Sequence, residues 1–558
     1  MILSQARIAG LGLGLATQIL AGPDSVTMAE APHLVSGRTA TQLSVQGRPF
    51  LVLGGEVRNS STSSLDYMRP VWSRLAALHL NTVLAPVSWE QLEPQEGRFD
   101  FALVDGLIAG ARANRLHLVL LWFGSWKNMV SSYAPQWVRA NPHRFPLTVD
   151  DAGNWLPIPS TFGENTRAAD AGAFGALLRH IRQTDAAEQT VIMVQVENEV
   201  GLEHSLRDRS AAAQAAFQAP LPPELADRLL HHGDGLTREL RAAWEAAGAR
   251  TSGSWADVFG PGPVADELFM TWQYARYIDA VAAAGQAEYR LPFFVNAAIG
   301  RQDGKIGTYP GGGALPLGFD LWHLAAPHIQ ILSPDIYYGS FAGWCRAYTQ
   351  SQNPLFIPET MGGDAGAANA LFAIGRWNAI GISPFAIDDH PAAEDQFVRT
   401  YGLLAQLSPL ILAHQGDGSM SAAVLNHDNP AQTLVLGRYA LNIVLRRERK
   451  SSWVAESGYI LAIAEQADRF IVAGKDVQVT FTADGAPPAV VELAKVEEGT
   501  FVNGRWVPGR RLNGDEIMLD YDLSNLAAKN QTGTGLSFGA EGPTVLRADV
   551  FRREPGRP

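Results

Sequence analysis

The sequence predicts an α/β protein in which a (β/α)8 TIM barrel is followed by a C-terminal antiparallel β-sandwich. From Pro49 onward, short apolar segments alternate with segments of helical periodicity until eight candidate strands have occurred, the number that closes a parallel barrel. Near residue 415 this alternation ends, and apolar residues then recur at every second position, which is typical of antiparallel strands. The 558 residues exceed the usual size of one hydrophobic core, which favours two domains.

The first four predicted barrel strands are separated by helices of amphipathic spacing. The helix over residues 64–78 shows this pattern, because its apolar residues lie three and four positions apart. The fourth strand begins at Val191, is rich in β-branched residues and ends in the sequence Glu197-Asn198-Glu199. In chain order, the expected elements before it are strand 50–56, helix 64–78, strand 80–87, helix 104–115, strand 116–122 and helix 171–184.

The second half of the predicted barrel contains a long insertion and four more strands. Residues 202–262 are rich in alanine, leucine and alternating charges, so we expect inserted helices on the functional face. These helices either shape a cleft or make no contact with a ligand. The remaining elements are expected at helix 268–287, strand 293–298, strand 329–338, strand 354–359, strand 382–387 and closing helix 392–413.

These elements divide the chain into three parts. Residues 1–31 form an N-terminal extension, residues 32–415 the barrel and residues 416–558 the C-terminal domain, with a boundary at the turn sequence that begins at Gly416. We expect the C-terminal domain to be chiefly structural, although carbohydrate binding and support of an oligomer are alternatives. Its expected strands lie at residues 433–436, 459–463, 470–473, 476–481 and 489–493.

Composition argues against several classes of function. The 44 Lys and Arg residues against 56 Asp and Glu residues give a net charge of −12 without a basic stripe, so no nucleic-acid partner is expected. The single cysteine, Cys345, cannot form an intramolecular disulfide and is expected to fill apolar space. Histidines such as His79, His117, His180 and His323 show no ligand spacing, so no metal site is expected.

The N-terminal residues have features of a secretion signal. Arg7 supplies an early positive charge, an apolar run follows over residues 8–22, and small residues come next. This run is shorter than a membrane span. We therefore expect export to the periplasm or the medium and no membrane span; the alternative is an N-terminal extension without a targeting role.

Two glutamates at predicted strand ends point to chemistry on a glycosidic bond. Glu199 follows the fourth strand and Glu359 ends the seventh, so both are expected at the C-terminal face of the barrel, where barrel enzymes hold their reactive groups. Hydrolysis with retention requires one carboxylic acid and one carboxylate roughly 5 Å apart. Although 359 − 199 = 160 residues separate them in sequence, closure of the barrel would bring them together.

Three sequence blocks resemble the clan A glycoside hydrolases, and more narrowly a divergent bacterial branch of the family 35 β-galactosidases. They are Gln195-Val-Glu-Asn-Glu-Val-Gly201, the pair Leu80-Asn-Thr-Val83 and Trp89 to Phe101, and Ile357-Pro-Glu359. The resemblance implies that Glu199 is the acid/base, that Glu359 is the nucleophile and that Asn198 binds the sugar 2-hydroxyl. It gives Glu197 no catalytic role, and strand alternation points that side chain away from Asn198.

The chain departs from the family after the third strand. Many members carry a Tyr-Ile-Cys-Ala-Glu-Trp-like segment whose Glu helps to hold galactose, whereas this chain reads Trp122-Phe-Gly-Ser-Trp-Lys-Asn128. Trp126 could stack on the sugar and Lys127 could donate to its hydroxyls, so both are candidate substrate-binding residues. The alternatives are a core tryptophan and a solvated lysine.

Three further residues are candidates for the site. Tyr337, at the end of the sixth strand, could donate a hydrogen bond that keeps Glu359 ionised and aimed, or it could pack in the barrel. Glu56, at the end of the first strand, could bind a sugar hydroxyl or form a structural pair with Arg58 or another basic residue. Trp89 is expected to line the site.

The expected activity is that of a retaining, exo-acting glycoside hydrolase that releases terminal β-D-galactose from a carbohydrate substrate. No metal or organic cofactor is expected. The alternatives are the same machinery on another sugar, as in an α-L-arabinopyranosidase or a β-glucosidase, and a carbohydrate-binding barrel without activity. A barrel aldolase or isomerase would require a strand-end lysine, a metal cluster or a phosphate-binding loop, which the sequence does not display convincingly. The sequence leaves a homo-oligomer open.

Overall fold

The computed structural model describes residues 30–203, 205–300, 305–389, 396–447, 454–483, 490–519 and 533–553. Nearly all of the predicted secretion signal, residues 1–29, lies outside this part of the chain, as does the predicted start of the closing helix. In the described residues, no helix is both long and apolar enough to cross a lipid bilayer.

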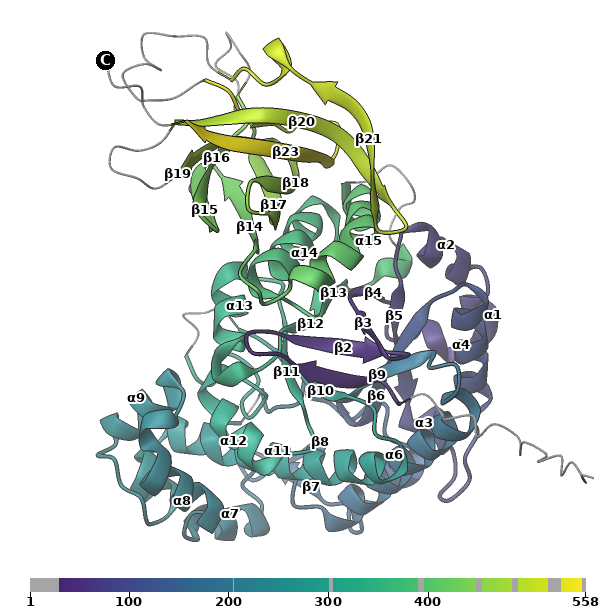
Figure 1. Cartoon of the computed structure of the whole chain (residues 1–558). Helices are drawn as coiled ribbons and strands as arrows, with labels where there is room; N and C mark the ends of the chain where they lie inside the picture. Colours follow the sequence, from purple (N-terminus) through teal and green to yellow (C-terminus); the bar gives the residue numbers. More distant parts are fainter. Residues whose placement is uncertain are drawn as a thin grey trace, which may run out of the picture.

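The barrel predicted from the sequence is confirmed. Eight parallel strands lie in the order β11-β10-β9-β6-β5-β4-β13-β12, and a parallel bridge between Ile336 and Thr360 joins the two ends (Figure 1). At this seam the backbone N–H of Ile336 donates to the carbonyl of Glu359 at 2.9 Å. The strands are β4 (Val52–Glu56), β5 (Thr82–Ser88), β6 (His117–Lys127), β9 (Val191–Asn198), β10 (Phe293–Ala298), β11 (Ile331–Asp335), β12 (Phe356–Thr360) and β13 (Gly381–Pro384).

Helices surround this barrel and bury their apolar faces on it. In α4 (Ala102–Ala113) the buried residues Val104, Leu107, Ile108 and Ala111 recur at helical spacing. The single helix predicted over residues 64–78 is divided at Pro70, which has no backbone N–H to donate. The principal helices are α1 (Leu65–Met68), α2 (Val71–Ala77), α4 (Ala102–Ala113), α6 (Glu164–Asp185), α11 (Pro263–Glu288), α12 (Phe319–Ala325), α13 (Phe341–Tyr348), α14 (Gly363–Trp377) and α15 (Gln396–His414).

A small N-terminal sheet, which the sequence analysis did not predict, closes the bottom of the barrel. It contains β1 (His33–Ser36), β2 (Thr41–Val45) and β3 (Arg48–Phe50) in antiparallel order. Leu43 and Val45 of β2 pack into the apolar interior of the barrel with residues of several barrel strands. This end is therefore filled with apolar side chains, which leaves the opposite, C-terminal end for polar groups.

Helices also lie between β9 and α11, in the region where the sequence predicts inserted helices. This region contains α7 (Ala211–Gln218), α8 (Pro223–His232), α9 (Arg238–Ala246) and α10 (Trp255–Phe259), and most of it extends to one side of the barrel (Figure 1). A short unpredicted hairpin, β7 (Leu147–Val149) and β8 (Trp155–Pro159), precedes α6, and the short helices α3 (Trp89–Leu92) and α5 (Gln136–Arg139) follow β5 and β6.

The C-terminal domain is the predicted antiparallel β-sandwich. One sheet contains β14 (Met420–Asn426), β17 (Ser457–Gln466), β18 (Arg469–Lys475), β23 (Thr544–Arg553), β20 (Val490–Val502) and β21 (Arg505–Leu512). The other contains β15 (Ala431–Leu436), β16 (Tyr439–Leu445), β19 (Val477–Ala483) and β22 (Leu536–Ser537). Residues of both sheets share one apolar core. The first sheet packs against α14, where a Cβ atom on Gly375 would lie 2.3 Å from Leu461.

Candidate active site

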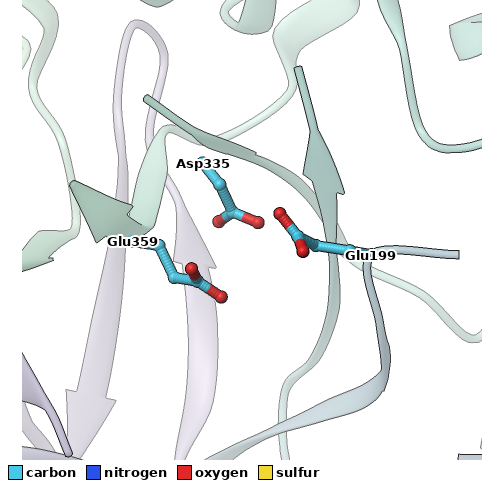
Figure 2. Close-up of side chains that lie close together, drawn as sticks. All are labelled: Glu199, Asp335 and Glu359. Carbon is cyan, nitrogen blue, oxygen red and sulfur yellow. The ribbon is translucent and has the colours of Figure 1, made fainter. Parts of the chain in front are cut away.

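Glu199 and Glu359 meet at the C-terminal end of the barrel, as the sequence predicted. Glu199 directly follows β9 and Glu359 lies near the end of β12. A third carboxyl group, that of Asp335 at the end of β11, lies beside them (Figure 2). One carboxylate oxygen from each of the three residues lies within 4.8 Å of the other two. This spacing is compatible with the roughly 5 Å between carboxyl groups that a retaining glycosidase requires.

The backbone turns sharply where β9 delivers Glu199. Glu197 has a φ of 61° and Glu199 a φ of 44°, so two non-glycine residues adopt the left-handed region on either side of Asn198. Such conformations are costly and persist only where the surroundings hold them. One restraint is direct, because the backbone N–H of Glu199 donates to Oδ1 of Asn296 at 2.9 Å.

Three donors surround the carboxylate of Glu359. The Tyr337 hydroxyl lies 2.8 Å from Oε2, and the side-chain amides of Asn198 and Asn296 lie 3.4 Å and 3.3 Å from Oε1. Glu359 is 5% exposed, so these donors replace the water that an ionised carboxylate requires. The predicted contact of Tyr337 with Glu359 is confirmed, and this environment suits a nucleophile that must remain ionised.

Lys127 fixes the orientation of the Asn198 amide. Its ammonium donates to Oδ1 of Asn198 at 2.8 Å, which leaves the amide nitrogen facing Glu359. Lys127 is buried at the end of β6 and its ammonium lies 4.9 Å from the centre of the Phe123 ring. It is therefore a site residue, and the alternative of a solvated lysine is wrong.

Glu199 has the opposite environment to Glu359. Burial and the negative charge of Glu359 raise the pKa of Glu199 to about 7, while Lys127 acts in the other direction. A carboxyl group that titrates near neutrality can give up and regain a proton during a reaction. Glu199 is thus suited to gain and lose a proton, whereas Glu359 is surrounded by hydrogen-bond donors.

Glu56 is buried without a partner. The side chain is 0% exposed, and neither carboxylate oxygen receives a hydrogen bond from the described residues. Burial and then the charge of Glu359 raise the pKa of Glu56 well above its ordinary value. The suggested pair with Arg58 is wrong, because Arg58 binds Asp389 instead. Contact of Glu56 with a sugar hydroxyl stays a prediction.

The two tryptophans predicted to contact substrate lie elsewhere, so both predictions are wrong. Trp126 is fully buried, and its ring packs edge-on against Tyr274 and Tyr277 of α11, with centroids 5.2 Å and 4.5 Å away. Trp89 is also fully buried and donates its indole N–H to Glu93 at 2.8 Å. Neither ring offers a free face for a sugar.

Glu197 points away from the site, as strand alternation predicted. Its carboxylate accepts the backbone N–H groups of Ser125 and Trp126 at 3.1 Å and 2.8 Å. These contacts hold a bulge in β6 that places Lys127 opposite Asn198. Gly124 is required in this bulge, because a Cβ atom there would lie 2.5 Å from a Glu197 oxygen.

Sequence reasoning missed Asn296 and Asp335. Asn296 donates to Oδ2 of Asp335 at 2.7 Å and also contacts Glu359 and the Glu199 backbone, so it links three strand ends. Both residues were visible in the sequence as single polar side chains near the ends of apolar strands. The sequence did not show which polar side chains at these strand ends would contact one another in the closed barrel.

The carboxyl groups of Glu199, Asp335 and Glu359 also have a spacing that a divalent cation could bridge. Their other contacts suit hydrolysis better. Glu359 is already supplied with three hydrogen-bond donors, and Glu199 titrates near neutrality. A cofactor-free site stays a prediction.

Residues 68–282 match a family model described as β-galactosidase, that of glycoside hydrolase family 42. This match supports the resemblance to clan A and does not support the narrower assignment to family 35. Residues 397–522 match the model of a domain of unknown function, DUF5597. No curated protein matches the sequence.

Solved structures similar to the chain include three described as β-galactosidases. The enzyme from Bacillus circulans sp. alkalophilus is 14% identical with a TM-score of 0.46, that from Marinomonas ef1 is 14% identical with 0.44, and that from Rahnella sp. R3 is 18% identical with 0.43. The matches cover 65%, 65% and 66% of this chain and 57%, 60% and 57% of theirs, in that order. The chain therefore spans less than two thirds of the length of these proteins.

Proposed function

We propose that this protein is a retaining, exo-acting β-galactosidase. The observation that carries the proposal is the pairing of Glu199 and Glu359, whose carboxylate oxygens come within 4.8 Å and whose environments differ as double displacement requires. The β-galactosidase model matched by residues 68–282 supports galactose as the sugar. The finer resemblance to family 35 rests on the sequence blocks alone.

In the first step, Glu359 attacks the anomeric carbon while Glu199 gives its proton to the leaving glycosidic oxygen. The bond to the aglycone breaks, and a covalent glycosyl ester of Glu359 forms. Tyr337 and the amides of Asn198 and Asn296 hold the attacking carboxylate in place. The proton is available because Glu199 has a pKa raised to about 7.

In the second step, Glu199 acts as a base. Once Glu359 is esterified, its negative charge no longer raises the pKa of Glu199, so Glu199 loses its proton more readily. The resulting carboxylate takes a proton from water, the water oxygen attacks the anomeric carbon, and the ester bond to Glu359 breaks. Both glutamates return to their starting states.

Three polar residues provide the proposed contacts to the sugar. Asn198 is assigned to the 2-hydroxyl, since its amide nitrogen already faces the nucleophile. Lys127 is buried beside Asn198 with donors to spare, and Glu56 offers two carboxyl oxygens that have no hydrogen-bond partner among the described residues. Together they replace the galactose-binding glutamate that many family 35 members carry after the third strand.

The test is hydrolysis of aryl β-D-galactoside, β-D-glucoside, β-D-fucoside and α-L-arabinopyranoside by the wild type, Glu359→Gln and Glu199→Ala. We expect preference for the galactoside, loss of turnover in Glu359→Gln, and partial rescue of Glu199→Ala by azide, which needs no proton removed before it attacks. Preference for another glycoside would mean that the protein acts on a different sugar by the same mechanism. Full activity of Glu359→Gln would show that Glu359 is not the nucleophile.

Two further proposals rest on the sequence alone. Export to the periplasm or the medium is proposed from the N-terminal segment, and fractionation of cells expressing the full chain would test it. The C-terminal domain is proposed to be chiefly structural, and light scattering of the purified chain would decide between a monomer and the homo-oligomer that the sequence leaves open.

A further inference from the structure

Asp335 is an additional carboxyl group at the centre of the proposed site. It ends β11, is 2% exposed and points toward the carboxyl groups of Glu199 and Glu359 (Figure 2). The double-displacement mechanism uses only two carboxyl groups, so the position of this third one requires an explanation.

The contacts of Asp335 require a proton. Oδ2 accepts a hydrogen bond from Asn296 at 2.7 Å, and Oδ1 receives none from an N–H or hydroxyl donor of the described residues. One carboxyl oxygen of Asp335 and one of Glu199 lie within 4.8 Å of each other, and the two side chains point toward each other (Figure 2). Because two ionised carboxylates repel each other at this distance in a buried site, one of the two groups must be protonated.

The neighbouring groups and the burial of each side chain indicate whether Asp335 or Glu199 keeps its proton. Asp335 is faced by three other acidic side chains, those of Glu359, Glu199 and Glu56. The phenol groups of Tyr337 and Tyr348 also lie near it. The cation of the site, Lys127, donates to Asn198. Burial, and then the charge of Glu359, raise the pKa of Asp335 well above its ordinary value. Asp335 is 2% exposed and receives one side-chain hydrogen bond from the described residues, that of Asn296, whereas Glu199 is only partly buried, so the proton is held more tightly on Asp335.

We propose that Asp335 is a positioning residue, a neutral carboxylic acid that donates its hydrogen to one oxygen of Glu199 and so aims the other at the glycosidic oxygen. This inference rests on the proposed function. In the first step the proton that leaves belongs to Glu199, and Asp335 retains its own. In the second step the same hydrogen bond stabilises the Glu199 carboxylate until it takes a proton from water.

The kinetic test compares Asp335→Asn with Asp335→Leu. The amide is neutral at every pH and can still donate to Glu199, so Asp335→Asn should keep kcat within about tenfold of the wild type, with the alkaline limb of its pH profile intact. Leucine has a similar size and no donor. Hydrogen bonds to charged groups are stronger than those between neutral groups. The fall in kcat of Asp335→Leu should therefore exceed the change in its KM by about 10- to 100-fold. Equal loss in both variants, or an active Asp335→Leu, would overturn the proposal.

An infrared measurement tests the same inference without any activity. The wild type at neutral pH should show the infrared absorption of protonated carboxyl groups, which comes from their carbonyl stretch. In Asp335→Asn this absorption should lose the component that belongs to Asp335. Glu267→Gln is the matched control, because Glu267 is a buried carboxyl group on α11 whose pKa is raised to about 7 by burial. Removal of the Glu267 carboxyl group should leave the infrared component of Asp335 unchanged.

The two measurements separate the possible failures. If the wild type hydrolyses no glycoside but Asp335→Asn loses the carboxylic acid signal, the proposed function fails and the protonation of Asp335 stands. If the signal is unchanged in Asp335→Asn, Asp335 is ionised and the inference is wrong, whatever the activity. Thermal unfolding of each variant shows whether it is folded, and the infrared result on Asp335→Asn decides the case should Asp335→Leu not fold.

Discussion

The hydroxyl of Tyr337 donates a hydrogen bond of 2.8 Å to Oε2 of Glu359, at the seam where the barrel closes. The residue before it, Ile336, donates its backbone N–H to the carbonyl of the same glutamate at 2.9 Å. One short segment after β11 therefore holds both the backbone and the side chain of the proposed nucleophile. The closure of the barrel and the aim of Glu359 depend on the same few contacts.

Removal of this hydroxyl should slow the reaction. Tyr337→Phe keeps the ring and loses a hydrogen bond to a charged group, so we expect kcat/KM for an aryl galactoside to fall about 10- to 100-fold. Tyr338→Phe is the control, because Tyr338 is 72% exposed. If the two variants have the same kcat/KM, the contact between Tyr337 and Glu359 does not contribute to the reaction.

The pH profile should show the titration of Glu199. Glu199 must be protonated to act as the acid and its pKa is raised to about 7, so kcat/KM should fall as the pH rises above about 7. Lys127 lowers this pKa by its positive charge. Lys127→Met should therefore move the alkaline limb to higher pH, in addition to lowering the rate through Asn198. A limb that moves to lower pH would contradict this placement of the lysine charge.

Glu56 should make the folded protein less stable at high pH. Burial raises its pKa well above the value of 4.5 for the exposed group, so the folded state binds its proton more tightly than the unfolded state does. The contribution to stability is complete below about 4.5 and is lost as the pH rises through the folded-state pKa.

Glu56→Gln removes this titration. Over that pH window the free energy of unfolding of the variant should fall less steeply than that of the wild type, by up to about 1.4 kcal/mol per pH unit. Denaturant titrations at a series of pH values measure both slopes. The exposed Glu188 provides the control variant, Glu188→Gln. Parallel slopes for Glu56→Gln and the wild type would show that Glu56 is ionised in the folded state.

Substitution of Trp126 should affect stability and not substrate binding. Its ring lies between β6 and α11, in contact with Tyr274 and Tyr277, so Trp126→Phe leaves unfilled volume in the core. We expect the free energy of unfolding to fall by roughly 1–3 kcal/mol while KM stays close to that of the wild type. A large rise in KM at unchanged stability would restore the stacking role that the structure argues against.

The barrel and its two glutamates could be predicted from the sequence because both depend on local patterns. Glu199 and Glu359 each end an apolar strand, and strand ends of one parallel sheet must lie at one face. The direction of Glu197 followed from strand alternation in the same way. The N-terminal sheet was missed because β1 and β3 are short and because Leu43 and Val45 gain their burial only inside the closed barrel.

The remaining site residues depend on long-range contacts that no local pattern specifies. Trp126 looked like a binding residue because strand 116–122 was expected to end before it, whereas β6 continues through a bulge to Lys127. The orientation of the Trp126 ring follows from that bulge. Asn296 and Asp335 were passed over because each becomes significant only beside the other strand ends.

The most direct test of the central claim is to trap the covalent intermediate. A 2-deoxy-2-fluoro-β-D-galactoside with a good leaving group should form the ester with the protein and hydrolyse slowly, because the fluorine removes the 2-hydroxyl contact that strengthens in the transition state. Peptide mass spectrometry should then find one sugar on the peptide that contains Glu359, and none in Glu359→Gln. A sugar on Glu199 or Asp335, or steady turnover of the galactoside without any labelled peptide, would contradict Glu359 as the nucleophile of a retaining enzyme.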